Sequence, residues 1–163
     1  MMGNVYEFNK ANREMTAREK AEQERARQIQ ELSNVPVPWF KHPTNDKNLE
    51  QFRHEFGNEA YGRLWELAEI LACTNSHAIP TPGERGYNGI LRALSYETTD
   101  EGAEQFENLV SALADYDIAT IDESGRRGIV YVDEAALAIA EKRYNGSIGG
   151  NAARYNRRRK ALA

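Results

Sequence analysis

The chain has 163 residues, of which 40% are hydrophobic and 28% are charged. This composition predicts one domain of ordinary size with a heavily charged surface. The single cysteine, Cys73, excludes an internal disulfide framework and is typical of a reducing compartment. No apolar run is long enough to span a bilayer, and no stretch has the pattern of a signal peptide. We therefore expect a cytoplasmic protein without a membrane partner.

Charge is distributed unevenly along the chain. Residues 1–44 hold 7 Lys and Arg against 6 Asp and Glu, residues 45–125 hold 5 against 16, and residues 126–163 hold 9 against 3. The three segments therefore carry net charges of +1, −11 and +6, which gives −4 for the whole chain. This pattern predicts an acidic body followed by a basic C-terminal arm.

The first 34 residues are predicted to form a charged N-terminal helical arm. Its opening residues contain Tyr6 and Phe8 without clear periodicity, which fits either a short docking peptide or a frayed end. T-A-R-E at 16–19 is a capping-box pattern, and helix-forming residues with opposite charges three or four apart follow it. Because this helix is polar on nearly all sides, we interpret it as a solvated arm. A docking helix for a partner or a second copy is the alternative.

The segment 39–71 is predicted to be the centre of the fold. It follows V-P-V-P at 35–38, an extended linker, since proline cannot continue a helix. It opens with an aromatic pair and then shows two amphipathic helical patterns separated by Gly57. Gly57 can adopt the positive φ that ends a helix, and Asn58 can cap the next one. We predict a helical hairpin that breaks at Gly57.

Further elements follow this hairpin, each indicated by its own periodicity or turn residues. They are a short strand at 78–80, a helix at 87–94, a helix capped by Asp100, strands at 118–121 and 129–132 around E-S-G-R-R-G, and a closing helix at 133–144. The large residues on their inward faces are expected to form one core: Trp39, Phe40, Leu49, Phe52, Phe56, Leu64, Trp65, Leu91, Phe106, Leu109 and Leu113.

The order of these motifs resembles a known family. W-F-K-H at 39–42, N-D-K-N-L at 45–49, a glycine-terminated short helix and A-Y-G-R-L-W-E-L-A-E-I-L at 60–71 resemble the N-terminal winged-helix domain of phage and plasmid replication initiators, the replisome-organiser or DnaD-like proteins. The resemblance extends from about residue 38 to the glycine pair at 149–150. It implies DNA binding in the replication of a phage or mobile element, and a protein partner in the replication machinery.

The resemblance also implies an architecture. The fold class would be mainly α with a small β-hairpin (α+β), a winged helix-turn-helix preceded by the charged helical arm. The expected divisions are the arm at 1–34, the linker at 35–38, the winged-helix domain at 39–144 and a glycine-containing basic C-terminal arm at 145–163. Residues 101–114 would be the recognition helix, and residues 122–128 would be the wing.

The expected recognition helix lacks the charge that a DNA reader needs. It contains no Lys or Arg, and Glu101, Glu104 and Glu107 are expected on its outward side. Carboxylates directed toward phosphates raise the Coulomb energy and release no counterions. These three acids therefore suggest a face for a basic protein partner.

Positive charge gathers instead on the expected wing and tail, where an aromatic residue lies among the arginines. Such clusters suit phosphate contact with base stacking, and the glycines before them would let the arm adapt. A solubilising tail and an acidic protein partner are the alternatives. The candidate DNA-binding residues are Arg126, Arg127, Arg154, Tyr155, Arg157, Arg158, Arg159 and Lys160.

No catalytic site or cofactor is predicted. The chain has no P-loop, nucleophile elbow or dinucleotide fingerprint. We interpret His42, His54, Cys73 and His77 as ordinary loop and surface residues, because they lack the paired spacing of a zinc site. Two hypotheses remain: a non-enzymatic DNA-binding protein acting through wing and tail, and a protein-interaction module whose acidic face binds a basic host protein as an inhibitor or DNA mimic. The sequence leaves the oligomeric state open.

Overall fold

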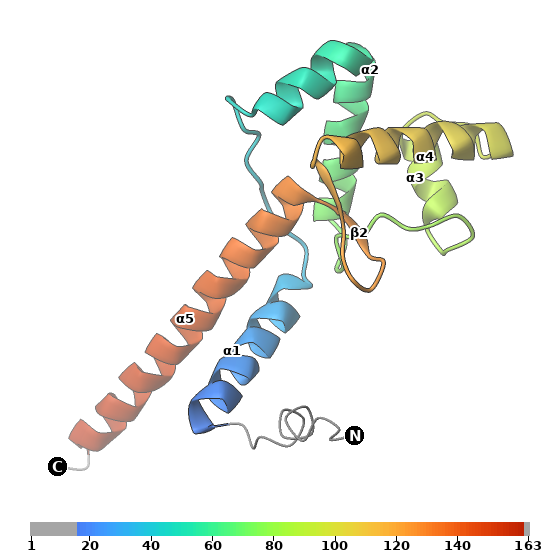
Figure 1. Ribbon diagram of the computed structural model, residues 1–163. Helices are drawn as coiled ribbons and strands as arrows, with labels where there is room; N and C mark the ends of the chain where they lie inside the picture. Colours follow the sequence, from blue (N-terminus) through green and yellow to red (C-terminus); the bar gives the residue numbers. More distant parts are fainter. Residues whose placement is uncertain (1–15, 162–163) are drawn as a thin grey trace, which may run out of the picture.

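The computed structural model describes residues 16–161, with side chains up to residue 150. It is mainly helical, with a small two-stranded antiparallel sheet (Figure 1). The elements are α1 (Ala17–Ser33), α2 (Lys47–Ala72), α3 (Tyr87–Ala93), α4 (Asp100–Asp115), β1 (Ala119–Ile121), β2 (Arg127–Ile129) and α5 (Val130–Ala161). Within this part of the chain, no helix combines the length and the apolar run that crossing a membrane requires.

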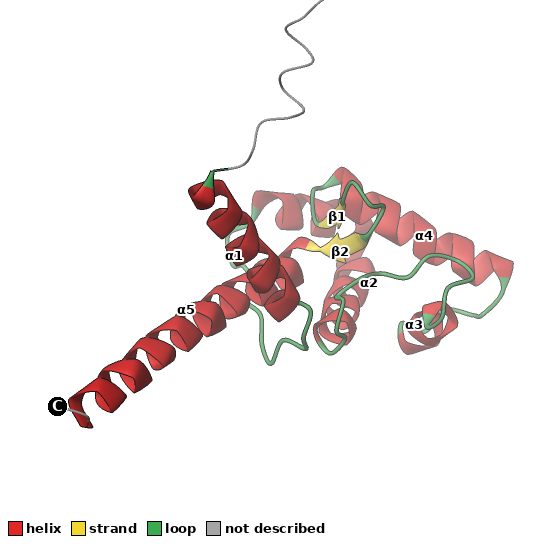
Figure 2. Cartoon of the chain, turned by 90° about the horizontal axis from the view of Figure 1, so that it is seen from below, coloured by secondary structure: helices red, strands yellow, loops and turns green. Residues whose placement is uncertain are grey.

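The molecule has two regions, which Figures 1 and 2 show from different sides. The body, residues 35–129, gathers α2, α3, α4 and the sheet around one core, to which the first turns of α5 add Tyr131, Val132 and Ala136. The stem consists of α1 and α5, which pack against each other in opposite directions. α5 leaves the body directly after β2, and its C-terminal end lies far from the body (Figures 1 and 2).

The predicted break at Gly57 is confirmed. Gly57 has φ 83° and ψ 178°, so the two helical segments of α2 meet at a kink. The side chain of Asp46 begins the helix by accepting hydrogen bonds from the backbone N–H groups of Asn48 and Leu49, at 3.0 and 3.1 Å. The side-chain oxygen of Asn58, expected to cap the second segment, accepts a hydrogen bond from Nε of Arg53 at 2.8 Å.

α4 begins one residue earlier than its predicted cap implied. Thr99, rather than Asp100, is the N-cap, and its hydroxyl accepts a hydrogen bond from the N–H of Gly102 at 3.2 Å. Gly102 also brings the helix close to the preceding loop, where an added Cβ would lie 2.0 Å from the carbonyl oxygen of Glu97. A larger residue at 102 would therefore push the first turn of α4 away from this loop.

The predicted hairpin is present, but its second strand begins and ends earlier. Ala119 pairs with Ile129 and Ile121 with Arg127, and α5 begins immediately afterwards at Val130. The expected strand at 129–132 is therefore wrong beyond its first residue, because a short apolar run can be buried equally well in a strand or a helix. The predicted strand at 78–80 is a single bridge, in which the N–H of Ile79 donates to the carbonyl oxygen of Arg127 at 2.8 Å.

The core agrees with the prediction except among the aromatic residues near its edge. Trp39 is 55% exposed and Phe56 is 42% exposed, while Phe40 is half-buried. Phe56 packs on the rim of the core, with its ring centroid 5.0 Å from that of Phe52. The predicted core residues that the structure buries are Leu49, Phe52, Leu64, Trp65, Leu91, Phe106, Leu109 and Leu113.

The stem departs most from expectation. The capping box of α1 is present, yet the C-terminal part of the helix is not solvated on all sides, because Ile29 and Ser33 are buried. Ala140 of α5 is also fully buried, and the guanidinium of Arg25 lies over the ring of Tyr144 at 5.8 Å. Small side chains such as Ala140 permit close contact between the two helices.

A buried histidine fastens the stem to the body. One ring nitrogen of His77 lies 2.9 Å from the carbonyl oxygen of Leu71, at the end of α2, and the other lies 3.1 Å from that of Ser33, at the end of α1. His77 is therefore a structural residue of the core, not the loop-surface residue that the sequence suggested.

Candidate functional site

The candidate residues are spread over the body and the stem. Arg126 and Arg127 lie at the hairpin, inside the body, whereas the other basic candidates lie on the last turns of α5. The three glutamates expected to form a partner face lie on α4. The hairpin and α4 come together at Arg127 and Glu107, so part of the expected basic site meets part of the expected acidic one.

Arg126 is held against the start of α5. Its two terminal nitrogens lie 3.1 and 2.7 Å from the carboxylate oxygens of Asp133, and one of them also donates to the carbonyl oxygen of Ser76 at 2.8 Å. The hydrogen bond to Asp133 raises the pKa of Arg126 above its ordinary value. Asp122 organises the turn before it by accepting the N–H groups of Ser124 and Arg126, both at 2.9 Å. The guanidinium of Arg126 thus links the turn to the body.

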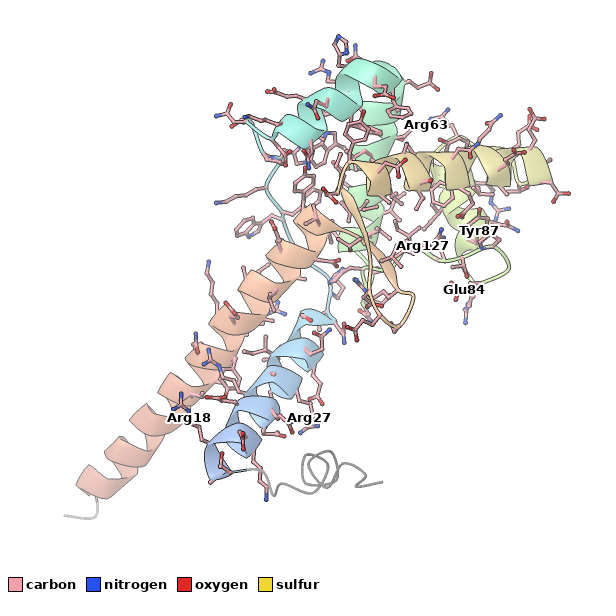
Figure 3. The ribbon with its side chains drawn as sticks, viewed as in Figure 1. Arg18, Arg27, Arg63, Glu84, Tyr87 and Arg127 are labelled. Atoms are coloured by element: carbon pink, nitrogen blue, oxygen red, sulfur yellow. The ribbon has the colours of Figure 1, made fainter. Side chains whose placement is uncertain are left out.

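The side chain of Arg127 is more deeply buried than that of Arg126. Its guanidinium lies 2.5 Å from one carboxylate oxygen of Glu107 and 3.3 Å from the other, and it also donates to the carbonyl oxygen of Pro80. Figure 3 labels Arg127 and, on α3, Tyr87. The Tyr87 hydroxyl donates to the same carboxylate at 3.0 Å. Burial, and then this hydrogen bond, raise the pKa of Tyr87 to about 12. Only 10% of the Arg127 side chain is exposed, so its charge is directed inward.

These ion pairs change the interpretation of both predicted faces. Glu107, expected on an outward acidic face, is half-buried and paired with Arg127, whereas Glu101 and Glu104 are exposed. Glu101 lies in the first turn of α4, where a negative charge stabilises the helix N-terminus. Of the three acids predicted to form a partner face, only Glu101 and Glu104 are therefore exposed, and Glu101 also stabilises its own helix.

The basic residues near the C-terminus lie on a helix. The sequence predicted a helix at 133–144 and an adaptable arm after it, but α5 continues to Ala161. Glycines at 146, 149 and 150 lie within the helix, although each costs about 1 kcal/mol of helix stability relative to alanine. With 32 residues, α5 is roughly 48 Å long, and the 17 residues of α1 cover roughly 26 Å.

A groove that the sequence did not indicate runs between residues 39–48 and the first turns of α5. It has a volume of about 690 Å³ and is lined by Trp39, Lys41, His42, Pro43, Thr44, Asp46, Asn48, Asp117, Val130, Tyr131, Glu134, Ala135, Ala138, Ile139 and Lys142. The exposed Trp39 forms part of its apolar surface. The only clue in the sequence was the aromatic residue directly after the prolines.

A hydrogen bond closes the body side of this groove. The Tyr131 hydroxyl donates to the carboxylate of Asp46 at 2.8 Å, which lowers the pKa of Asp46. Burial, followed by the same hydrogen bond, raises the pKa of Tyr131. The imidazole of His42 stacks on the buried Trp65, with ring centroids 3.9 Å apart. The wall of the groove is thus built from packed rings joined to the N-terminus of α2.

The histidines and the cysteine have different surroundings. Cys73 is exposed at the end of α2, while His42 stacks in the groove wall and His77 is buried. Among the described residues, no three histidine, cysteine or acidic side chains come close enough together to hold a metal ion.

Comparisons with protein-family models, with curated proteins and with solved structures give no match to this chain.

Proposed function

We propose that this protein binds DNA through the basic C-terminal end of α5. The observation that carries the proposal is the continuity of α5, which begins in the body at Val130 and includes five basic residues between Arg154 and Lys160. These five residues span roughly 9 Å of helix axis. A helix that concentrates positive charge in this way can neutralise several phosphates and lie in or across a groove of the duplex.

The charge of the body favours contact at this end of the molecule. Residues 45–125 carry a net charge of −11, which repels phosphates. The hairpin does not offset this repulsion, because Arg126 and Arg127 are paired with Asp133 and Glu107. DNA should therefore approach the end of the stem, where the basic residues are farthest from the acidic body.

We further propose that the body is a winged-helix variant, as the resemblance to replication initiators suggests. The order of α2, the bridge at Ile79, α3, α4 and the β1–β2 hairpin supports this assignment. In this variant α4 occupies the place of a recognition helix but exposes Glu101 and Glu104. The body would then serve as a scaffold for the DNA-binding helix, and the proposed context is replication of a phage or mobile element.

The test measures binding to a fluorescently labelled duplex by anisotropy at low salt. Replacing Arg157, Arg158 and Arg159 with alanine should weaken binding on the order of tenfold or more, similarly for unrelated sequences. The slope of log affinity against log salt should fall by about 0.9 for each phosphate that the variant no longer neutralises.

A matched control removes the same charge from the body. Lys47, Arg85 and Arg92 are exposed there, and their triple alanine variant should bind DNA nearly as well as the unchanged chain. Equal losses in both variants would show that only net charge matters. Unchanged affinity after loss of the three α5 arginines would refute the proposal.

A further inference from the structure

Both ring nitrogens of His77 face a carbonyl oxygen. Nδ1 lies 2.9 Å from that of Leu71 and Nε2 lies 3.1 Å from that of Ser33, and only 2% of His77 is exposed. A neutral imidazole has one N–H group, so it can donate to one of these oxygens, and the lone pair of its other nitrogen then faces the second. The protonated ring has two N–H groups and donates to both. The geometry therefore matches the imidazolium form.

The ends of two helices add a preference for positive charge at this position. Leu71 lies in the last turn of α2, and Ser33 is the last residue of α1. The carbonyl groups at the C-terminus of a helix carry partial negative charge, which stabilises a nearby cation. Because both helix ends meet at one ring, each of them stabilises the protonated form of His77.

The charged side chains near the ring have a negative balance. Of the described residues that line the cavity of about 250 Å³ beside His77, the charged ones are Asp122 and Arg126 of the β1–β2 turn and Asp133 of α5. Arg126 and Asp133 pair at 2.7 Å, so their charges offset each other. Hydrogen bonds from the Ser124 side chain and the Arg126 backbone lower the pKa of Asp122, which therefore keeps its negative charge. This balance also favours a protonated ring.

The backbone of the loop holds the ring between the two helix ends. His77 has φ 51°, in the left-handed region that residues other than glycine rarely adopt. Its N–H donates to the hydroxyl of Thr74 at 3.1 Å, and that hydroxyl donates to the carbonyl oxygen of Leu71 at 2.8 Å. These bonds tie the loop to α2, and they do not depend on the charge of the ring.

We propose that His77 is a pH-sensitive joint between the stem and the body. In its protonated form the ring donates to α1 and α2 at once and holds the end of α1 against the body. After the loss of one proton, a lone pair replaces one of the two donors, whichever nitrogen keeps its hydrogen. Because the docked state favours the protonated ring, its stabilisation is complete at acidic pH. It is lost as the pH rises through the range in which histidines titrate, about pH 5 to 8.

α1 buries few residues, so one hydrogen bond can change how often this helix opens. Ile29 and Ser33 are its buried residues, and most of the helix before residue 28 is exposed. The linker keeps its own attachment to the body, because the N–H of Val37 donates to the carbonyl oxygen of Ala72 at 2.8 Å. α1 can therefore leave α5 while the body stays folded. The joint is separate from the proposed DNA-binding end of α5, so it stands or falls independently of DNA binding.

Hydrogen exchange of the full chain at about pH 5.5 and about pH 8 tests the joint. Each rate is divided by that of an unstructured peptide at the same pH. The amides of α1 should be about tenfold better protected at the lower pH, which is the effect of one charge-assisted hydrogen bond. The amides of α4, in the body, should keep the same protection at both pH values.

A substitution assigns the pH difference to the ring. His77→Gln keeps a side chain that can donate a hydrogen bond but cannot titrate in this range, so the difference in α1 should disappear. The matched control is His54→Gln, because His54 is exposed on α2 and its loss should leave the difference unchanged. A pH difference in α1 that survives His77→Gln would overturn the proposal, because another group would then cause it.

A second measurement needs no substitution, so it does not depend on the folding of a variant. Nitrogen NMR of the isotope-labelled chain distinguishes an imidazolium, with two protonated ring nitrogens, from a neutral ring, with one. The ring of His77 should be an imidazolium at about pH 5.5, and it should lose a proton over the same pH range in which α1 loses protection. A neutral ring throughout, or equal protection of α1 at both pH values, would also overturn the proposal.

Discussion

The body and the stem are stabilised in different ways. In the body, large side chains such as Phe52 and Phe106 are fully buried, and the Arg127–Glu107 ion pair joins β2 to α4. In the stem, the ion pairs of Arg27 with Glu24 and Glu31 are exposed and local to α1. Burial of apolar area contributes far more than exposed local pairs. The body should therefore unfold as one unit, whereas the stem can be loosened while the body stays folded.

The largest effect should come from the centre of the body. Replacing Phe52, which is fully buried, with alanine should reduce the free energy of unfolding by about 3–5 kcal/mol. The matched control is Phe56→Ala, because Phe56 stacks on Phe52 but is 42% exposed. Denaturant titration should show a much smaller loss for the control. Similar losses in the two variants would mean that Phe56 contributes as much to stability as a fully buried core residue.

The next effect concerns the ion pair within the body. Arg127→Ala should destabilise the protein by about 2–3 kcal/mol, since it leaves the half-buried Glu107 without its cation. Arg27→Ala removes the same charge from exposed pairs on the stem and should leave the melting temperature unchanged. A double-mutant cycle with Glu107→Gln would measure the coupling. Absence of coupling would show that Arg127 acts through its packing and its hydrogen bond to Pro80, and not through Glu107.

A smaller and more local effect is expected in the stem. Ile29→Ala should weaken the contact of α1 with α5 by about 1–2 kcal/mol, less than a full core truncation because only this one helix face is buried. Hydrogen exchange should accelerate in α1, while the amides of α4 keep their protection. Equal acceleration in both helices would mean that stem and body form one cooperative unit.

The pH dependence of stability tests the hydrogen-bonded cluster in the body. Because the pKa of Tyr87 is raised to about 12 from 10.0, its neutral form is favoured by folding. Its contribution is complete below pH 10 and is lost as the pH rises toward about 12. Tyr87→Phe should cost about 1 kcal/mol at neutral pH, through loss of the bond to Glu107. It should also make the fall in stability between these pH values less steep.

The sequence was most informative about local structure in the body. The ability of glycine to adopt positive φ predicted the break at Gly57, and apolar periodicity predicted most of the core. Both signals depend only on residues that are close together in the sequence. The pairing of Arg127 with Glu107 could not be predicted, since twenty residues separate them and each alone looked like a surface charge. The exposed Trp39 was misplaced for a related reason. Hydrophobicity alone does not tell a core residue from one that lines a groove.

The stem was harder to predict. Its glycines at 146, 149 and 150 indicated a break, yet the helix continues through them. Helix propensity is a weak local preference, and neighbouring structure commonly overrides it. Part of α5 is supported by packing against α1, which the pattern of α1 did not show, because a buried face can be made from one isoleucine and a few small residues.

The smallest effect on the stability of the body, and the sharpest test of the stem, is expected at Gly150. Space around this residue is open, so alanine fits there and should increase helix stability by about 1 kcal/mol. Gly150→Pro should break or kink α5 at a cost of about 3 kcal/mol to the helix. Neither change should alter the melting temperature of the body, because residue 150 lies 20 residues beyond the start of α5, roughly 30 Å along the helix.

Measurements of DNA affinity then distinguish binding by a rigid basic helix from binding by a flexible basic tail. If the direction of α5 positions the arginines on the duplex, Gly150→Ala should bind DNA at least as tightly as the unchanged chain, while Gly150→Pro should bind more weakly. Both variants keep every basic residue, so the nonspecific electrostatic attraction is the same in each. Circular dichroism of the two variants confirms the change in helix content. Equal affinities despite different helix content would mean that the basic residues bind DNA but that the direction of α5 does not matter.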